Sequence, residues 1–379
     1  MAFPSDNRPS LQQRWRPFGA IRGVARRRFY RFLERALGTD DGRRIISEAS
    51  PGMPFRPPSG WNISPPYNDL GRPANRARAT GRDDIIFVTG RFRSGSTLLW
   101  NLFRNVEGVT AYYEPLNERR WFDRRSRGGH TDSTHRKVAD YWREYDGLDD
   151  LGRWYREDWI RRDLLMAEDA WDPGLTGYVD TLIERAPGRP VLQFNRIDFR
   201  LPWFRRQYPR ATFIHIYRHP RDQWCSTLQG DLIRFPRDGT MADFIPFDKF
   251  YLGTWAADLK YRFPFLEERS DAHPYRIFYY IWILSYIFGE HFCHYSIQFE
   301  RFMGRPEEQL IELFDRVGII GADLAALRLL IEPPVLGKWR QYAEAGWFED
   351  HEAACEEVLG EFLGSTRSGV IPEPFAAHL

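Results

Sequence analysis

The segment IIFVTGRFRSGSTLLW, residues 85–100, decides the fold of this chain. It begins with a short apolar run, which is typical of a buried parallel strand. A turn containing Gly90 and Gly95 follows, and an apolar helical pattern then opens at Ser96. Glycine lets backbone N–H groups approach an anion, and a helix N-terminus adds unpaired donors and the positive end of its dipole. The segment therefore predicts a phosphate-binding loop between a strand and a helix.

The loop departs from the P-loop of nucleoside triphosphate enzymes in one respect. That motif is Gly-x-x-x-x-Gly-Lys-Ser/Thr, whereas here Gly95 is followed by Ser96 and Thr97, so the lysine is missing. A cation stands earlier in the loop instead, at Arg93. This arrangement argues against an ordinary ATPase or kinase. The alternative without a ligand is a Ser/Gly turn that caps a helix.

A second anion-binding pattern lies more than a hundred residues downstream. Residues 211–217 form an apolar run that predicts a strand, and Arg218 stands at its end. Pro220 suits the first turn of a helix, where its missing N–H costs little. Ser226 then lies about two turns into that helix. A guanidinium and a hydroxyl placed in this way can reach one anion between them.

Together the two patterns resemble sulfotransferases that use 3′-phosphoadenosine 5′-phosphosulfate (PAPS). Residues 90–97 are similar to the family's 5′-phosphosulfate loop, and the 218–226 segment is similar to its 3′-phosphate-binding segment. The resemblance covers about residues 83–342. It implies an α/β fold of the three-layer, P-loop NTPase-like type, with a central parallel sheet flanked by helices. It also implies PAPS as co-substrate, no required metal, and donor-binding residues Arg91, Phe92, Arg93, Ser94, Gly95, Ser96, Thr97, Arg218 and Ser226.

Three further positions follow from the resemblance with less specific motifs. Tyr-Glu-Pro-Leu after the strand expected at 109–113 resembles the segment that carries an acidic general base in bacterial and Golgi carbohydrate sulfotransferases. It implies Glu114 as the base, with Arg93 as the catalytic cation; a solvated glutamate before a turn is the alternative. The segment 333–340 resembles a basic segment over the 3′-phosphate and adenine, which implies roles for Lys338 and Trp339. A surface loop is its alternative.

One position departs from the family pattern. Many relatives carry a lysine in the third strand, here expected at 191–195, that stabilises the transferring group, and Gln193 stands in its place. Arg196 is a possible substitute, and Arg93 alone could suffice. Asp198 and His215 are reserve candidates for the general base should Glu114 not serve.

Composition limits the other functions. The chain has 379 residues, 42% of them hydrophobic, and a net charge of +2, which gives no case for nucleic acid binding. The three cysteines are widely spaced and predict no disulfide framework, and His291, Cys293 and His294 lack further zinc ligands. The first residues show no secretory signal, and the longest apolar run, 277–288, is too short to span a bilayer. This run predicts a buried helix at 274–290 instead. We therefore expect a soluble cytoplasmic enzyme.

The sequence predicts three parts. Residues 1–80 form a basic, Pro/Arg-rich extension, in which an amphipathic helix at about 20–37 could touch an anionic membrane or pack on the domain. Residues 81–345 form the catalytic domain, with a helical insertion at about 119–180 whose aromatic side chains could stack on an acceptor or fill a core. Residues 346–379 form a C-terminal helix and tail.

The predicted reaction is transfer of a sulfuryl group from PAPS to an acceptor hydroxyl. Sugar, lipid, peptide tyrosine and small phenol acceptors all remain open, with a carbohydrate or glycolipid acceptor slightly favoured. The sequence leaves the oligomeric state open. Two alternatives remain at this point. One is a P-loop kinase or phosphotransferase, and the other is a non-catalytic nucleotide-binding relative, which the missing strand lysine favours.

Overall fold

The computed structural model describes Phe32, Thr39 and residues 81–132, 134–135, 137–229, 234–267 and 271–365. The helix expected at about 20–37 and the tail after residue 365 lie outside this part of the chain, apart from Phe32. The predicted membrane contact and the boundary at residue 80 therefore stay predictions.

A five-stranded parallel sheet forms the centre of the molecule. Its strands are β1 (Ile86–Thr89), β2 (Val109–Tyr113), β3 (Arg189–Phe194), β4 (Thr212–Tyr217) and β5 (Tyr295–Gln298). Their order across the sheet is β2-β3-β1-β4-β5, and every neighbouring pair runs parallel. In the central strand, Val88 lies opposite Gln193 on one side and Ile214 on the other. The strand segments expected from the apolar runs all form.

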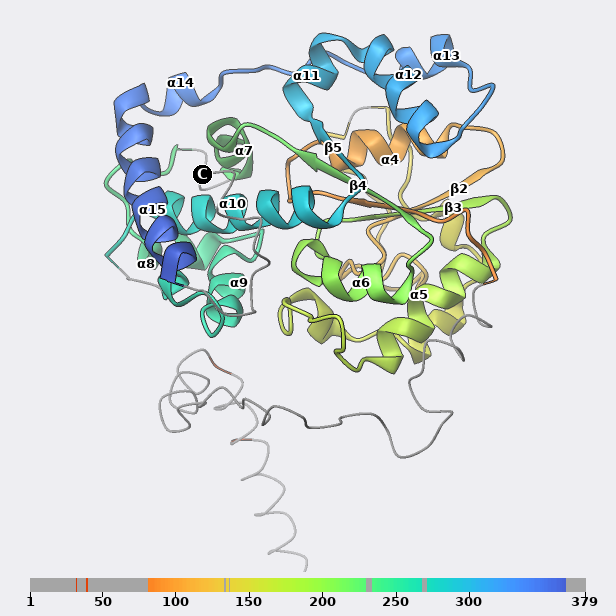
Figure 1. Ribbon diagram of the computed structural model, residues 1–379, viewed down its shortest axis with the longest axis horizontal. Coiled ribbons are helices and arrows are strands. Elements are labelled where there is room, and N and C mark those ends of the chain that lie inside the picture. The colour runs from red at the N-terminus through yellow and green to blue at the C-terminus, as the bar shows by residue number, and fades with distance from the viewer. Residues whose placement is uncertain are drawn as a thin grey trace, which may run out of the picture. The chain divides into compact units, whose positions relative to one another are not determined.

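Helices cover both faces of the sheet (Figure 1). One face carries α4 (Ser96–Arg104), α11 (Phe299–Gly304), α12 (Pro306–Val317) and α13 (Leu324–Arg328). The other carries α5 (Pro173–Arg185) and α6 (Leu201–Gln207). The prediction of a three-layer α/β fold around a parallel sheet is confirmed.

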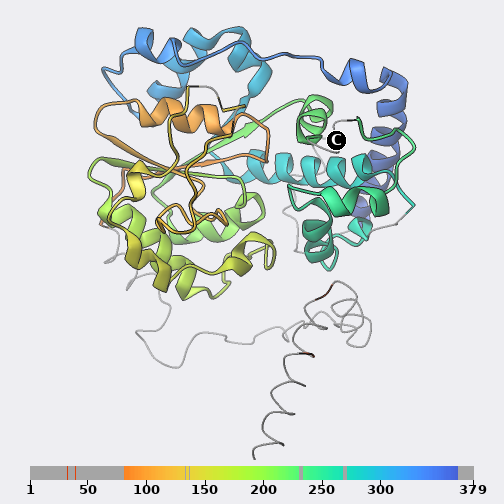
Figure 2. The ribbon, with the colours of Figure 1, turned by 180° about the vertical axis from the view of Figure 1, so that it is seen from behind.

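A second group of helices lies together to one side of the sheet (Figure 2). Its members are α7 (Pro220–Thr227), α8 (Met241–Phe244), α9 (Leu252–Leu259), α10 (Pro274–Phe292), α14 (Trp339–Tyr342) and α15 (Ala345–Ser365). The buried helix expected at 274–290 is α10. It packs against α15, where Phe348, Cys355 and Leu359 are fully buried. The Tyr275 hydroxyl donates to Glu352 Oε1 at 2.6 Å and ties the two helices together.

The insertion is less helical than its sequence predicts. Before α5 it contains three short 3₁₀ helices, η2 (Arg143–Tyr145), η3 (Asp149–Arg153) and η4 (Glu157–Ile160), joined by turns. Aspartates cause this, since Asp123 accepts from the Arg125 N–H and Asp140 from the Trp142 N–H, and such local bonds compete with a helix. Elsewhere in the described part of the chain, 3₁₀ helices include η5 (Asp198–Arg200), η7 (Ile245–Phe247) and η8 (Pro264–Leu266).

Candidate functional site

The carboxyl ends of four strands bring the sequence motifs to one edge of the sheet. β1 leads into the glycine loop, β4 into Arg218, β3 into Asn195 and Arg196, and β2 into Glu114. The chain adds strands first on one side of β1 and then on the other: β2 and β3 lie on one side, and β4 lies on the other. Open α/β sheets bind ligands at such a point, outside the carboxyl ends of the strands.

A cavity of about 350 Å³ opens at the ends of β1 and β4. We call it the donor cavity. Its polar wall comes from the glycine loop, the start of α4, the β4–α7 segment and the insertion, and its apolar wall comes from α11 and the segment before α14. It is lined by Arg93, Gly95, Ser96, Thr97, Leu98, Asn101, Thr134, His135, Val138, Arg218, Ser226, Phe299, Met303, Leu330, Glu332, Pro333, Pro334, Val335 and Lys338.

Two arginines from adjacent strands meet in this cavity. The Arg218 Nη1 lies 3.5 Å from the Arg93 carbonyl oxygen. The Arg93 Nε donates to the Ser226 hydroxyl at 3.0 Å, so Ser226 links the two motifs. Burial lowers the pKa of both guanidiniums, which means that each charge is partly removed from water.

Neither arginine has a full set of partners. The Arg218 Nε is buried and has no hydrogen-bond partner within the described part of the chain, and its nearest carboxylate, on Glu300, is 3.9 Å away. Arg93 forms a 3.6 Å ion pair with Asp132 and donates to Thr134 at 3.0 Å. A buried donor without an acceptor is costly, so this cavity suits an anionic ligand.

The glycine loop needs glycine where it meets α4. Gly95 has φ 102°, and a Cβ there would overlap the ring of Phe299. Because Phe299 closes this side, the first turn of α4 stays turned toward the cavity, where Ser96 and Thr97 line it. The first N–H groups of a helix have no intrahelical acceptor and are free to bind an anion.

Four predicted donor-binding side chains lie away from the cavity. The Arg91 guanidinium stacks on the Trp255 ring at 4.1 Å, and Phe92 packs against Phe250. The Ser94 hydroxyl is buried. Trp339 stacks on His219 with ring centroids 6.3 Å apart, rather than facing the cavity. The prediction that Trp339 packs on the base has no support from this placement.

Lys338 does line the cavity, and a buried aspartate places it there. The Asp222 carboxylate accepts the Gly337 N–H at 2.7 Å and the Trp339 N–H at 3.3 Å. It thereby anchors the 337–339 turn to the start of α7. Asp222 lies within the 218–226 motif, but its role could not be predicted because its partners lie more than a hundred residues away in the chain.

Glu114 occupies a buried and constrained position at the end of β2. Its φ is 38°, a conformation that costs energy for a residue with a side chain and is found preferentially at functional sites. Oε1 accepts from Asn195 at 2.6 Å, whereas Oε2 accepts from Asn117 at 2.6 Å and from Arg196 at 3.1 Å. The alternative of a solvated glutamate is wrong, since the residue is 7% exposed.

Arg196 completes what we call the Glu114 cluster, defined as Glu114, Asn117, Glu118, Asn195 and Arg196. Its Nη2 donates to Glu118 at 2.7 Å, so one guanidinium is shared between two carboxylates. The cluster does not line the donor cavity. Tyr113, which precedes Glu114 in the chain, reaches the cavity wall, where its hydroxyl lies 3.2 Å from the Thr97 hydroxyl.

Comparison with known proteins decides the family. The family model described as "Sulfotransferase family" matches residues 84–323, which is well over half of the chain. The chain belongs to the sulfotransferase family. A comparison with curated proteins finds no match. The crystal structure of a sulfotransferase from Mycobacterium avium is similar with a TM-score of 0.41 and 12% identity, covering 79% of this chain and 82% of that one, which is too distant to add to the argument.

In this sulfotransferase, Gln193 is fully buried in β3 where many family members carry a lysine. Neither of its amide atoms has a hydrogen-bond partner among the described residues. Its neighbours across the sheet are Val88 and Tyr113, which places it close below the glycine loop. Arg196, the possible substitute, is held by Glu114 and Glu118 instead.

The two reserve bases are part of the sulfotransferase core. The Asp198 carboxylate is buried between the hydroxyls of Thr89 and Ser285, to which it is hydrogen-bonded. His215 is buried against Gly289 and lies 3.3 Å from the Ser296 hydroxyl. Both are only 1% exposed, and neither lines the donor cavity.

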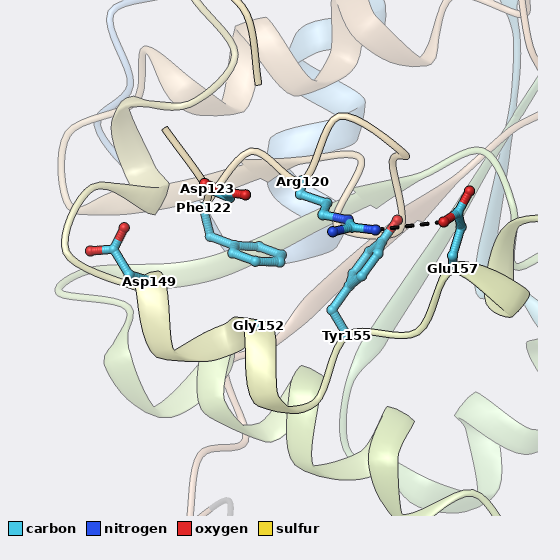
Figure 3. A pocket seen from close by; sticks show the side chains of 7 residues that line it. All are labelled: Arg120, Phe122, Asp123, Asp149, Gly152, Tyr155 and Glu157. Carbon is cyan, nitrogen blue, oxygen red and sulfur yellow. Dashed lines mark ion pairs between the residues drawn. The ribbon is translucent and has the colours of Figure 1, made fainter. Parts of the chain in front are cut away.

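A second, smaller hollow of about 210 Å³ lies on the insertion (Figure 3). The rings of Phe122 and Tyr155 face it, and an ion pair of 3.5 Å joins Arg120 to Glu157 beside Tyr155. The Tyr155 hydroxyl donates to the Asn117 carbonyl at 2.9 Å, which connects this hollow to the Glu114 cluster.

Two features are not found within the part of the sulfotransferase that the structure describes. There is no group of three or more His, Cys, Asp or Glu side chains that could hold a metal ion. No described helix is long and apolar enough to cross a bilayer.

Proposed function

We propose that this sulfotransferase transfers the sulfuryl group of PAPS to a hydroxyl of an acceptor. The observation that supports it most is the meeting of Arg93 and Arg218 in one cavity of about 350 Å³. The donor carries anionic groups at its 3′ and 5′ positions, and a cavity with two incompletely paired guanidiniums offers a partner for each.

The donor would lie with its two ends on different motifs. Arg218 would hold the 3′-phosphate, because its Nε is buried without a partner within the described residues, and Ser226 and Lys338 stand beside it on the wall. The first turn of α4, with Ser96 and Thr97, would hold the 5′-phosphosulfate. The apolar wall that includes Phe299 leaves room for the base.

The reaction would be an in-line displacement at sulfur. The acceptor oxygen attacks the sulfur, the bond from sulfur to the 5′-phosphate oxygen breaks, and the products are a sulfate ester and 3′,5′-ADP. Charge develops on the departing oxygen, where Arg93, Thr97 and the loop amides supply preorganised donors. A sulfuryl group carries less charge than a phosphoryl group, so we propose no metal in the step.

Glu114 would receive the acceptor's proton. Asn195 donates to Oε1, whereas Asn117 and Arg196 donate to Oε2. The neighbouring Tyr113 side chain also interacts with this carboxylate. These partners fix the direction of the carboxylate and hold the base in place.

For the acceptor, we propose a carbohydrate or glycolipid hydroxyl. Aromatic rings offer faces for the apolar side of a sugar, and the half-buried Tyr155 presents such a ring in the hollow connected to Asn117 (Figure 3). Most other aromatic side chains of the insertion serve as core: Trp121 and Trp159 are almost fully buried.

Two measurements test the proposal and separate it from the alternatives. The midpoint temperature of thermal unfolding should be raised by 3′,5′-ADP and not by ATP with Mg²⁺. A ligand that binds the native state and not the unfolded state stabilises the native state. Formation of 3′,5′-ADP from PAPS should depend on an acceptor from a panel of sugars and glycolipids. Stabilisation by ATP with Mg²⁺ alone would favour a kinase, and binding of 3′,5′-ADP without PAPS consumption would favour a non-catalytic relative.

A further inference from the structure

We propose that His135 is a catalytic residue, a neutral imidazole whose Nε2–H donates a hydrogen bond to the sulfuryl group in transfer. The inference rests on the proposed function and adds a residue to it. His135 comes from the insertion, outside both anion-binding motifs, and lines the donor cavity beside Thr97 and Arg93. The insertion therefore contributes to the reaction as well as covering the site.

A chain of hydrogen bonds decides which ring nitrogen carries the proton. The Tyr141 hydroxyl oxygen accepts the Asp132 N–H at 2.8 Å and lies 2.6 Å from His135 Nδ1. Burial raises the pKa of Tyr141 to about 12, so the phenol keeps its proton at neutral pH. No other acceptor for that proton is found among the described residues, so we infer that it points to Nδ1. Nδ1 is then the acceptor, and the imidazole hydrogen sits on Nε2.

The Nε2–H faces the start of α4. It lies 3.4 Å from the Thr97 hydroxyl, whose other partner is the Tyr113 hydroxyl at 3.2 Å. A contact of 3.4 Å is long for a hydrogen bond, so the His135 donor remains free to bind a stronger acceptor placed between His135 and Thr97. The oxygens of a bound sulfuryl group are acceptors of that kind.

The buried position of His135 keeps it neutral. Burial is the largest cause and lowers its pKa to about 4; Arg93 acts in the same direction, and Asp132 acts against both. Tyr113 and Tyr141 are the other titratable groups whose rings face it, and both are protonated at neutral pH because burial raises their pKa values. In this neutral state His135 would donate a hydrogen bond from Nε2, and Glu114 would keep the role of base.

Three hydrogen-bond donors lie on the polar wall of the donor cavity, one each from Arg93, Thr97 and His135. Donors fixed before the reaction cost no reorganisation when charge develops, and removing one of them from an enzyme lowers kcat by roughly 10²–10³-fold. We expect His135 to act in this way on the transferring group. Because 3′,5′-ADP lacks a sulfuryl group, its binding should depend little on His135.

Two substitutions separate the donor from the ring. His135→Phe keeps an aromatic ring and removes both nitrogens, whereas His135→Gln keeps an amide N–H near the position of Nε2. We expect kcat for PAPS turnover to fall about 10²-fold in the Phe variant and by less than about tenfold in the Gln variant. The Kd of 3′,5′-ADP, measured by calorimetry, should change less than about threefold in both, and thermal unfolding should show that both are folded.

Several results would overturn the assignment. They are a Phe variant with normal kcat, a Gln variant as impaired as the Phe variant, or a loss of 3′,5′-ADP affinity that parallels the loss of kcat. An independent readout is ¹⁵N NMR of the imidazole, assigned by its absence in the Gln variant: a neutral ring protonated at Nε2 is expected at pH 7, and protonation at Nδ1 or at both nitrogens would contradict it. Failure of the wild-type protein to bind 3′,5′-ADP would sink the proposed function instead, and the NMR result would still report on His135.

Discussion

The donor cavity and the Glu114 cluster lie at the same edge of the sheet but differ in how closely carboxylates approach their arginines. In the cavity, Arg218 has a buried Nε without a partner among the described residues, and its nearest carboxylate is 3.9 Å away. In the cluster, Arg196 is matched by two carboxylates at 3.1 and 2.7 Å. The Arg196 Nε also lacks a hydrogen-bond partner among the described residues, so the two arginines differ in how closely their charge is matched. A charge without a close carboxylate marks the place where an anion is expected to bind. A charge shared by two close carboxylates marks a group that is held in position.

The largest effect should come from removing the cation of the glycine loop. Arg93→Ala should lower kcat for PAPS turnover by about 10³-fold, because Arg93 supplies charge where the leaving oxygen becomes negative. Steady-state kinetics with a fixed acceptor would measure it. A variant that keeps kcat and only raises KM would place Arg93 in ground-state binding and remove it from the chemical step.

Next in size is the base of the Glu114 cluster. Glu114→Gln should lower kcat about 10²-fold and leave the Kd of 3′,5′-ADP nearly unchanged, since the cluster does not line the donor cavity. Glu118→Gln is the matched control, because Glu118 pairs with the same Arg196 but its side chain is 40% exposed. The control should keep kcat within a few-fold. Equal losses in the two variants would mean that the ion pairs matter and proton transfer does not.

The smallest expected effect is on the free energy of unfolding, from a substitution at Gln193 in β3. Gln193→Met should leave the free energy of unfolding unchanged or raise it by about 1 kcal/mol, because it removes a buried amide whose atoms have no partner among the described residues. Gln309→Met is the control, since the Gln309 amide donates to Glu312 at 2.9 Å, and it should lose about 1 kcal/mol. Urea denaturation would measure both. A clear loss in Gln193→Met would show that the amide has a partner in the folded protein.

The fold could be predicted from the sequence because each strand and helix is indicated by residues that lie close together in the chain. The strands of residues 85–89 and 211–217 are apolar runs followed by turn and helix-start residues, and the buried helix at 274–290 is a long apolar pattern. The insertion was the exception. There, aspartate side chains bind nearby backbone N–H groups and stop helices that composition alone seemed to favour.

The candidate site was accessible only in part, for a related reason. Arg93, Arg218 and Ser226 could be named because each follows a strand within a recognisable motif. His135 and Asp222 could not, since their roles depend on partners brought close by the fold: Thr97 in the first case and the Gly337–Trp339 turn in the second. The sequence also did not indicate which side chains of the glycine loop face the cavity. Arg91, for example, stacks on Trp255 instead.

The most direct test of the account is whether Arg218 recognises the 3′-phosphate. Calorimetry should compare the binding of 3′,5′-ADP and 5′-AMP to the wild-type protein, Arg218→Ala and the control Arg221→Ala, whose guanidinium pairs with Glu352 at 2.6 Å instead. We predict that Arg218→Ala loses roughly 10–100-fold in affinity for 3′,5′-ADP, as expected for a charged hydrogen bond, and much less for 5′-AMP. Equal losses for the two nucleotides, or no loss for either, would contradict it.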